Sequence, residues 1–484
     1  MKSIRAFKPF IRSYFLIACG VLSLAVCLVG FAQSSTSVPE PDTETAEVHC
    51  PDLGMCPRIP GTYDCMGVYC PFGGPTPAMT PLPIVPIIEQ LCKGYEVCSY
   101  DPVTGRQTCR QGPCPLAEPV ATSPSPFLIS EFRFRGPNGV NDEFVEIYNN
   151  TGYDLQVATR DGSAGWSLVA SDGLVRFVIP AGTVIPARGH YLAVNTLGYS
   201  LGSYPAGDDR TATADASYTL DIPDGAGIAL FTTTLPSNFK GSYRLDAAGY
   251  ETAPPLYREG AGFPFYGAET FVPLQYSFYR NLGSGWPQDT DDNAADFVGV
   301  DNNFYYTSQG HHLGAPGPEN LSSPTDGSGK ISVTLLDPAV SAGSPPNRVR
   351  DTTPDPANNS NLGTLSVRRK VTNISSSNIT RLRFRIIDIT TFPAPSGIAD
   401  LRPRSSFAPF NVTLADGSVV TVRGTSVETP PDQPNGGGFN SSMRANDVTL
   451  SQPLAPGQSI NLQFLLGVQQ SGTFHFYIAI EALS

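Results

Sequence analysis

From residue 127 onward, apolar and polar residues alternate over short runs that are separated by glycine and proline turns. Alternation with a period of two gives an extended strand one apolar and one polar face. No run of useful length shows the 3.6-residue period of an amphipathic helix. We therefore predict an all-β fold. The strands expected in its first part are 128–135, 143–148, 166–170, 175–179, 190–194, 227–231 and 243–246.

The alternation is clearest in the last third of the chain. In 381–386 every second residue is leucine, phenylalanine or isoleucine, and the residues between them are arginines. Asp416 and Gly417 favour a tight hairpin between 411–414 and 418–423. Together these runs predict a second β-sandwich of about eight strands, with long connections at 337–361 and 429–446. Its other expected strands are 331–336, 364–371, 448–450, 460–466 and 474–480.

The outward face of this pattern carries a stripe of three arginines, Arg381, Arg383 and Arg385. Such a stripe could bind an anionic ligand such as a charged polysaccharide. The alternative is a solvated sheet face, whose charges discourage association with other strands. Because the chain has a formal net charge of −12, we favour the solvated face.

Residues 1–32 have the pattern of a signal peptide. Four basic residues precede an apolar run at 14–31, and Ala32 follows. The alternative is an uncleaved anchor, because the run is marginally long enough to span a bilayer. We expect cleavage, secretion and no stable membrane insertion of the mature chain. Its negative charge makes nucleic acid an unexpected partner.

Cysteine usage supports an oxidising compartment. Eight of the ten cysteines lie in 33–120, in two sets of four with similar spacing, separated by a proline-rich spacer at 71–86. Such small units need covalent support, so we predict disulfides, with the pairing left open. Zinc is the alternative, but no Cys-x2-Cys pair occurs. The cysteines are Cys50, Cys56, Cys65, Cys70, Cys92, Cys98, Cys109 and Cys114.

Several short segments follow one another between residues 127 and 320. They are Ile129-Ser130-Glu131, then 142–149, 165–168, 179–192, 277–280, 289–297 and 314–318. In this order they resemble the lamin-tail domain in its bacterial secreted form. The resemblance implies an immunoglobulin-like sandwich with a binding or tethering role. The predicted organisation is a signal peptide at 1–32, a disulfide-rich segment at 33–120, a lamin-tail-like domain at 121–320 and a C-terminal β-sandwich at 321–484.

An acidic loop precedes the strand expected near residue 297. Asp289, Asp291 and Asn293 have the 1-3-5 spacing of a calcium loop, and Asp296 lies close by. The glycine and glutamate of an EF-hand are missing. We therefore favour capping of backbone amides by these side chains, with structural calcium as the alternative. Arg280 is expected to pair with one of these carboxylates near the surface.

Motifs of catalysis are not evident in the sequence. No Gly-x-Ser-x-Gly elbow and no His-Glu-x-x-His occur. We therefore expect no enzymatic activity and no cofactor. The predicted function is that of an exported structural or adhesive protein, which binds an unknown protein or polysaccharide partner. The alternative is an exported metal-dependent hydrolase, or a hydrolase accessory, with a site near 289–296 and the histidine pair His311 and His312.

Overall fold

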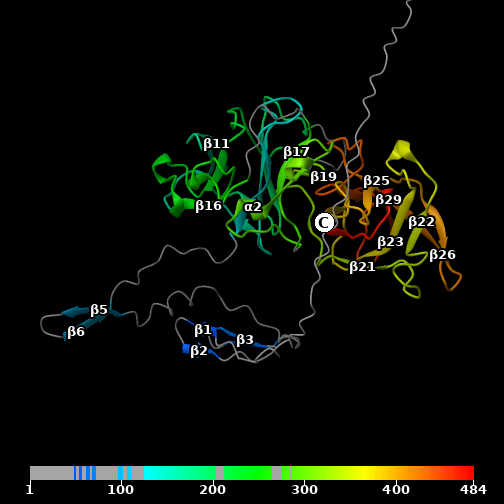
Figure 1. The fold of residues 1–484 in the computed structure, drawn as a ribbon, viewed down its shortest axis with the longest axis horizontal. Coiled ribbons are helices and arrows are strands. Elements are labelled where there is room, and N and C mark those ends of the chain that lie inside the picture. Colours follow the sequence, from blue (N-terminus) through cyan, green and yellow to red (C-terminus); the bar gives the residue numbers. More distant parts are fainter. Residues whose placement is uncertain are drawn as a thin grey trace, which may run out of the picture. The chain divides into compact units, whose positions relative to one another are not determined.

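The computed structural model divides the chain into two compact units, Met1–Cys114 and Pro115–Ser484. It describes residues 125–202, 212–263, 274–283 and 285–484, together with the backbone pairing of six short strands in the first unit. The described part of the chain is built almost entirely from strands, as Figure 1 shows. The predicted all-β class is confirmed.

The first unit contains three two-stranded ribbons, each antiparallel. The signal peptide and the eight predicted disulfide cysteines, as side chains, lie outside the described residues. The strands are β1 (Val48–Cys50), β2 (Gly54–Cys56), β3 (Thr62–Cys65), β4 (Val68–Pro71), β5 (Glu96–Asp101) and β6 (Arg106–Gln111).

The second unit begins with two sheets that face each other. The larger has the strand order β14-β13-β8-β7-β17-β18-β19 and the smaller the order β11-β10-β15-β16. Their strands are β7 (Phe127–Arg133), β8 (Phe144–Asn149), β10 (Gly165–Ala170), β11 (Val175–Pro180), β13 (His190–Asn195), β14 (Ala216–Tyr218), β15 (Gly227–Phe231), β16 (Arg244–Gly249), β17 (Tyr276–Arg280), β18 (Phe297–Asp301) and β19 (His312–Leu313). A small ribbon adds β9 (Leu155–Gln156) and β12 (Val184–Ile185).

One apolar core fills the space between these two sheets. It contains Ile129 and Ile147 from the larger sheet, and Trp166 and Leu230 from the smaller one. Phe132 lies in a group of aromatic rings, stacked on Phe278 with a centroid distance of 5.6 Å. This two-layer packing is that of a β-sandwich.

Helical structure in the described residues is limited to single turns. None of these helices is long and apolar enough to cross a bilayer. The turns are α2 (Asn293–Asp296), η1 (Pro236–Asn238), η2 (Gly241–Tyr243), η3 (Pro255–Tyr257), η5 (Thr307–Gln309) and η6 (Pro356–Asn358).

The C-terminal part is one sheet of eleven strands that folds over its own core. Strand β27 pairs with β28 near its end and with β29 nearer its middle, so it joins the two layers. The strands are β20 (Thr325–Asp326), β21 (Ile331–Leu335), β22 (Arg348–Asp351), β23 (Thr364–Asn373), β24 (Arg381–Ile389), β25 (Asp400–Arg404), β26 (Phe410–Thr413), β27 (Val419–Val427), β28 (Ser442–Ala445), β29 (Ser459–Gln470) and β30 (Phe476–Leu483).

The strand pattern predicted for this part is mostly confirmed. Leu382, Phe384 and Ile386 are fully buried in the core. The strand expected at 448–450 is wrong, because those residues form an irregular segment that follows a turn after β28. The two predicted long connections contain β22, which pairs with the following strand β23, and β28, which pairs with β27 and β24.

The register of β5 and β6 makes a prediction for the cysteines. Cys98 lies directly opposite Cys109. Opposite residues of an antiparallel pair have Cα atoms about 4.5–5.5 Å apart, which suits a disulfide. Peptide mapping of the unreduced mature protein should therefore yield a Cys98–Cys109 cross-link. Mapping that joined Cys98 to any other cysteine would contradict this register.

Candidate functional site

The arginine stripe is buried, contrary to its predicted exposure. Arg381, Arg383 and Arg385 are 3%, 2% and 6% exposed. Their side chains do point away from the apolar core of their own sheet, as the alternation predicted. That outward face is covered by the first sandwich and by the segment at 314–324. The stripe is therefore not a surface open to an anionic polymer.

Carboxylates inside the molecule pair with these arginines. Arg383 Nε lies 2.7 Å from Glu481 Oε2, and Arg385 Nε lies 2.9 Å from Glu481 Oε1. Glu481 is on the neighbouring strand, β30, in the register that places it opposite Arg383. Arg381 pairs with Glu428 at 2.7 Å. The stripe is thus neutralised by acids of its own sandwich and of the segment before it.

Glu319 connects the two sandwiches. It is fully buried, and its carboxylate contacts both Arg383 (2.6 Å) and Arg385. On its other side the same carboxylate lies 3.0 Å from His190 Nε2, on β13 of the first sandwich. The backbone amide of Glu319 donates to Glu146 Oε2 at 2.6 Å. One residue therefore holds charged groups from both sandwiches.

Two further glutamates of the first sandwich face this contact. Glu146 Oε1 lies 2.9 Å from His190 Nδ1. Glu131 Oε1 accepts hydrogen bonds from Ser277 Oγ (2.6 Å) and from the backbone amide of Gly317 (3.0 Å). The segment between the sandwiches is therefore fastened to the first sandwich through its backbone. We call this set of residues the charged interface: Glu131, Glu146, His190, Glu319, Arg381, Arg383, Arg385, Glu428 and Glu481.

The protonation states make the charged interface nearly neutral. Burial alone would lower the pKa of His190, but Glu319 and Glu146 outweigh it and raise that pKa, so both ring nitrogens can donate. Burial and the nearby Glu146 carboxylate raise the pKa of Glu131 to about 7. Below pH 7, where Glu131 is protonated and His190 is charged, the side chains of Glu146, Glu319, Glu428 and Glu481 face four cations.

A small cavity opens beside the charged interface. It has a volume of about 70 Å³, and its walls include Glu131, Glu146, Tyr148 and Trp286. This volume holds a few water molecules but no sugar ring. Glu146, His190 and Glu319 could offer three metal ligands. However, both imidazole nitrogens already face carboxylates, and Arg385 contacts the same Glu319 oxygen, which is the arrangement of an ion-pair network.

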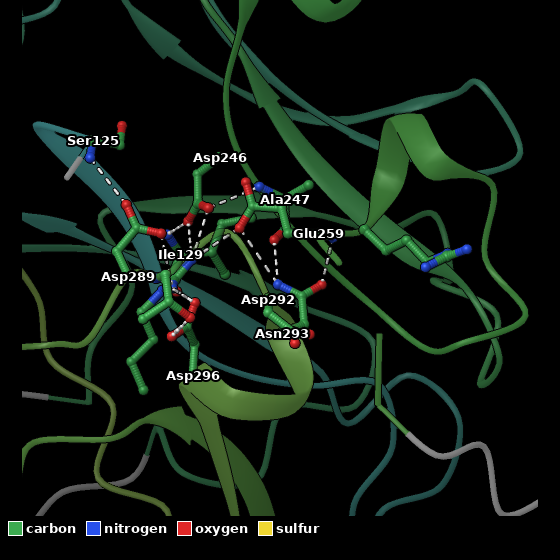
Figure 2. A network of polar contacts seen from close by, with 12 residues as sticks. Ser125, Ile129, Asp246, Ala247, Glu259, Asp289, Asp292, Asn293 and Asp296 are labelled. Carbon is green, nitrogen blue, oxygen red and sulfur yellow. Dashed lines mark hydrogen bonds and ion pairs between the residues drawn. The ribbon is translucent and has the colours of Figure 1, made fainter. Parts of the chain in front are cut away.

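A second buried ion-pair cluster surrounds Arg280 in the first sandwich. Its guanidinium lies 2.7 Å from Asp246, 3.4 Å from Asp289 and 3.3 Å from Asp296. Glu259 lies 3.6 Å away. Figure 2 shows Asp246, Glu259 and Asp289 turned toward one another. Since Asp246 is on β16 and Arg280 on β17, this pair ties the two sheets together at one edge.

Burial and the neighbouring Asp246 carboxylate raise the pKa of Glu259 to about 10, so Glu259 is protonated at neutral pH. Oxygen atoms of Asp246, Glu259 and Asp289 lie within 4.8 Å of one another. Arg280 supplies the positive charge within this group. The predicted pairing of Arg280 with an acid of the loop is correct, but the pair is buried and involves several carboxylates.

The predicted calcium residues do not converge in the 1-3-5 pattern. Asn293 Oδ1 accepts hydrogen bonds from the amides of Gly249 and Glu259. Asp289 and Asp296 face Arg280, and Asp291 lies at a turn with a φ of 58°. Capping is observed instead at Asp292, whose side chain accepts from the amide of Ala294 at the start of α2.

The histidine pair lies away from the acidic loop. Asp296 directly precedes β18, whereas His312 pairs with Val300 near the other end of that strand. His311 is buried, and burial lowers its pKa to about 4, so it is neutral at pH 7. His312 stacks on Phe439 of the C-terminal sandwich, with a centroid distance of 4.5 Å. The two parts of the predicted alternative site are therefore not brought together.

Sequence reasoning did not identify Glu131, Glu146, His190 and Glu319 as interface residues. A signal was present, because Glu131 and Glu146 each interrupt an otherwise apolar strand segment. Their partners described above lie at least 44 residues away in the sequence, so local spacing could not pair them.

Glu319→Gln tests the link between the sandwiches. The amide keeps the size of the side chain but removes the charge shared by His190, Arg383 and Arg385. Removing one partner of a buried pair costs about 3–5 kcal/mol, and we expect this loss in the free energy of unfolding by chemical denaturation. Asp447→Asn is the control, because its pair with Arg423 is exposed. That variant should lose less than about 1 kcal/mol.

The charged interface should be most stable at mildly acidic pH. The pKa of Glu131 is raised from 4.5 to about 7, so its contribution is lost as pH rises through that range. Burial opposes ionisation of Glu481, but Arg383 and Arg385 outweigh it and lower its pKa to about 2. That contribution is lost as pH falls below 4.5. Denaturation measured across pH should show greatest stability near pH about 4.5–5, with stability lost on both sides.

Glu131→Gln tests whether ionisation of Glu131 causes the loss of stability expected as pH rises. The variant stays neutral, so it should match the wild type at pH 5 and be about 1–3 kcal/mol more stable at pH 8. The exposed Glu251→Gln serves as the control and should leave the profile unchanged. Equal stability of Glu131→Gln and wild type at pH 8 would contradict the assigned ionisation.

Comparison with known proteins found no relative of this chain. No family model, no curated protein and no solved structure matches this chain. The resemblance to the lamin-tail domain therefore rests on the sequence segments themselves.

Proposed function

We propose that this chain is an exported, non-catalytic structural or adhesive protein of the bacterial cell envelope or extracellular space. Its two β-sandwiches act as one rigid body that presents binding surfaces to a protein or glycan partner. The lamin-tail-like character of the first sandwich is part of this proposal. So are the disulfides of the N-terminal segment, which would protect that segment outside the cell.

The observation that carries the proposal is the charged interface. Independent domains in one chain usually meet through smaller, wetter contacts and move relative to one another. Here buried glutamates and arginines, each at most 9% exposed, meet between the sandwiches, and Glu319 is shared by both sides. Separating them would take Glu319 away from either His190 or the pair Arg383 and Arg385, and breaking a buried ion pair is costly. A fixed orientation suits a protein that bears load or presents a surface.

The buried acidic side chains are engaged in ion pairs, which supports the same proposal. Asp246, Asp289 and Asp296 are all engaged by Arg280, and Glu146 and Glu319 by His190. Groups held in this way stabilise the fold. A catalytic carboxylate, in contrast, needs access to a substrate. The adjoining cavity of about 70 Å³ leaves room for water only.

The acids around Arg280 favour the second candidate, an exported metal-dependent hydrolase or hydrolase accessory. Oxygens of Asp246, Glu259 and Asp289 lie close enough to share one divalent ion. Calcium bound there in a structural role would also fit the main proposal. The two cases differ in what Asp289→Asn removes: hydrolytic activity in the first, and only thermal stability in the second.

Calorimetry of the mature protein tests the rigid-body part. We expect the two sandwiches to unfold in a single cooperative transition, because their charged faces lose their partners together. In Glu319→Gln this transition should broaden or divide into two. Two separate transitions in the wild type would contradict the rigid body.

Localisation and attachment test the adhesive part. The protein should be recovered outside the cytoplasm with Gln33 as its first residue, and it should sediment with purified envelopes of the producing bacterium. An intact N-terminus in the cytosol would contradict export. Metal-dependent hydrolysis lost in Asp289→Asn would replace the proposal with its alternative.

A further inference from the structure

A groove runs across the C-terminal sandwich, apart from both ion-pair clusters. It has a volume of about 400 Å³, within the range of small-ligand sites. Its walls come from three segments: the turn around Asn358, the loop that follows β25, and the connection between β27 and β28. These segments are distant in sequence, so the fold assembles the groove.

An exposed aromatic ring stands at this groove. Phe407 is 71% exposed, more than any other aromatic side chain in the described part of the chain. Covering a phenylalanine ring removes apolar surface from water, so an open ring beside a groove is a strong contact point for a ligand. Phe410, only three residues later, packs instead against the small cluster of Leu336 and Val422.

The groove carries no net charge. Arg404 is the one charged side chain among its described lining residues. That guanidinium lies 3.0 Å from Asp355 Oδ2 and donates to Ser360 Oγ at 2.6 Å. Because Asp355 neutralises it, the groove does not favour an anionic ligand. A neutral ligand fits this balance.

The polar groups of the groove are amides, hydroxyls and backbone. Asn358 donates through Nδ2 to Asp355, and Asn359 through Nδ2 to the carbonyl of Pro434. Among the residues that the structure describes, their Oδ1 atoms receive no hydrogen bond, so they remain acceptors for hydroxyl groups. Gly436 has a φ of 86°, which favours glycine, and a Cβ added there would lie 2.8 Å from Arg402 Cβ.

From this geometry we infer that the groove binds a neutral polysaccharide. A pyranose ring offers one face of C–H groups, which packs on an aromatic ring, and an edge of hydroxyls, which donate to amide oxygens. Phe407 provides the first contact, and Asn358 and Asn359 provide the second. The apolar side chains of the lining belong to Ala357, Pro403, Phe407, Val427 and Pro434. The inference rests on the proposed adhesive function and names its ligand class.

Calorimetric titration of the mature protein tests this inference. The probes are cellohexaose, chitohexaose and mannohexaose, with a polygalacturonate hexamer as the anionic comparison. We expect at least one neutral probe to bind and the anionic one to bind at least tenfold more weakly. Phe407→Ala should weaken binding at least tenfold, and Asn358→Ala severalfold. Val419→Ala is the matched control, since Val419 is 60% exposed and lies outside the groove.

The outcomes separate this inference from the proposed function. No binding of any neutral probe, or equal binding by Phe407→Ala, overturns the groove; envelope attachment that persists then leaves the adhesive function standing. Preferred binding of polygalacturonate also overturns the neutral ligand class. Recovery of a probe in cleaved form overturns the non-catalytic function while retaining the groove as a sugar site. Melting curves of each variant confirm that it is folded.

Discussion

The pairing of buried carboxylates with buried arginines between the two sandwiches is the constraint on which the rest of the molecule depends. Each sandwich has its own apolar core, and a core by itself says nothing about how two domains meet. Apolar contact would also tolerate several orientations. Charges taken out of water do not, because every one of them needs a partner at hydrogen-bonding distance. The charged interface therefore fixes one arrangement, whatever its net effect on stability.

The same constraint explains why both faces of the larger sheet are covered. All seven residues of β7 are buried, and so are all six of β8. One face contributes Ile129 and Ile147 to the apolar core, and the other presents Glu131 and Glu146 to the interface. An antiparallel sheet commonly leaves one face to solvent. Here the segment at 314–324 and the C-terminal sandwich take the place of that solvent.

Much of the fold, but little of the charged interface, could be predicted from the sequence. Alternation placed Leu382, Phe384 and Ile386 in the core, and the class was predictable from the turns between the strands. Alternation distinguishes two faces of a strand but does not say what covers the second face. Arg383 and Arg385 were therefore expected in water. Their partner Glu319 lies in a segment without any pattern, so no local rule could find it.

The acidic loop shows the same limit at shorter range. Spacing at 289–296 allowed both capping and calcium binding. What decides the geometry is Arg280 on one strand and Asp246 on another, and neither enters a motif based on consecutive positions. Side chains that are close in sequence acquire their role from residues that only the tertiary structure brings near.

The position of Glu481 on the last strand of the sheet has a consequence for biosynthesis. This carboxylate supplies a partner to both Arg383 and Arg385, and β30 also pairs with β20 at the start of the C-terminal sandwich. Until the ribosome has passed residue 481, the two arginines lack that partner and the first strand of the sandwich lacks its neighbour. Prematurely terminated chains would expose unpaired charge and an open strand edge, which are features that quality-control proteases can recognise.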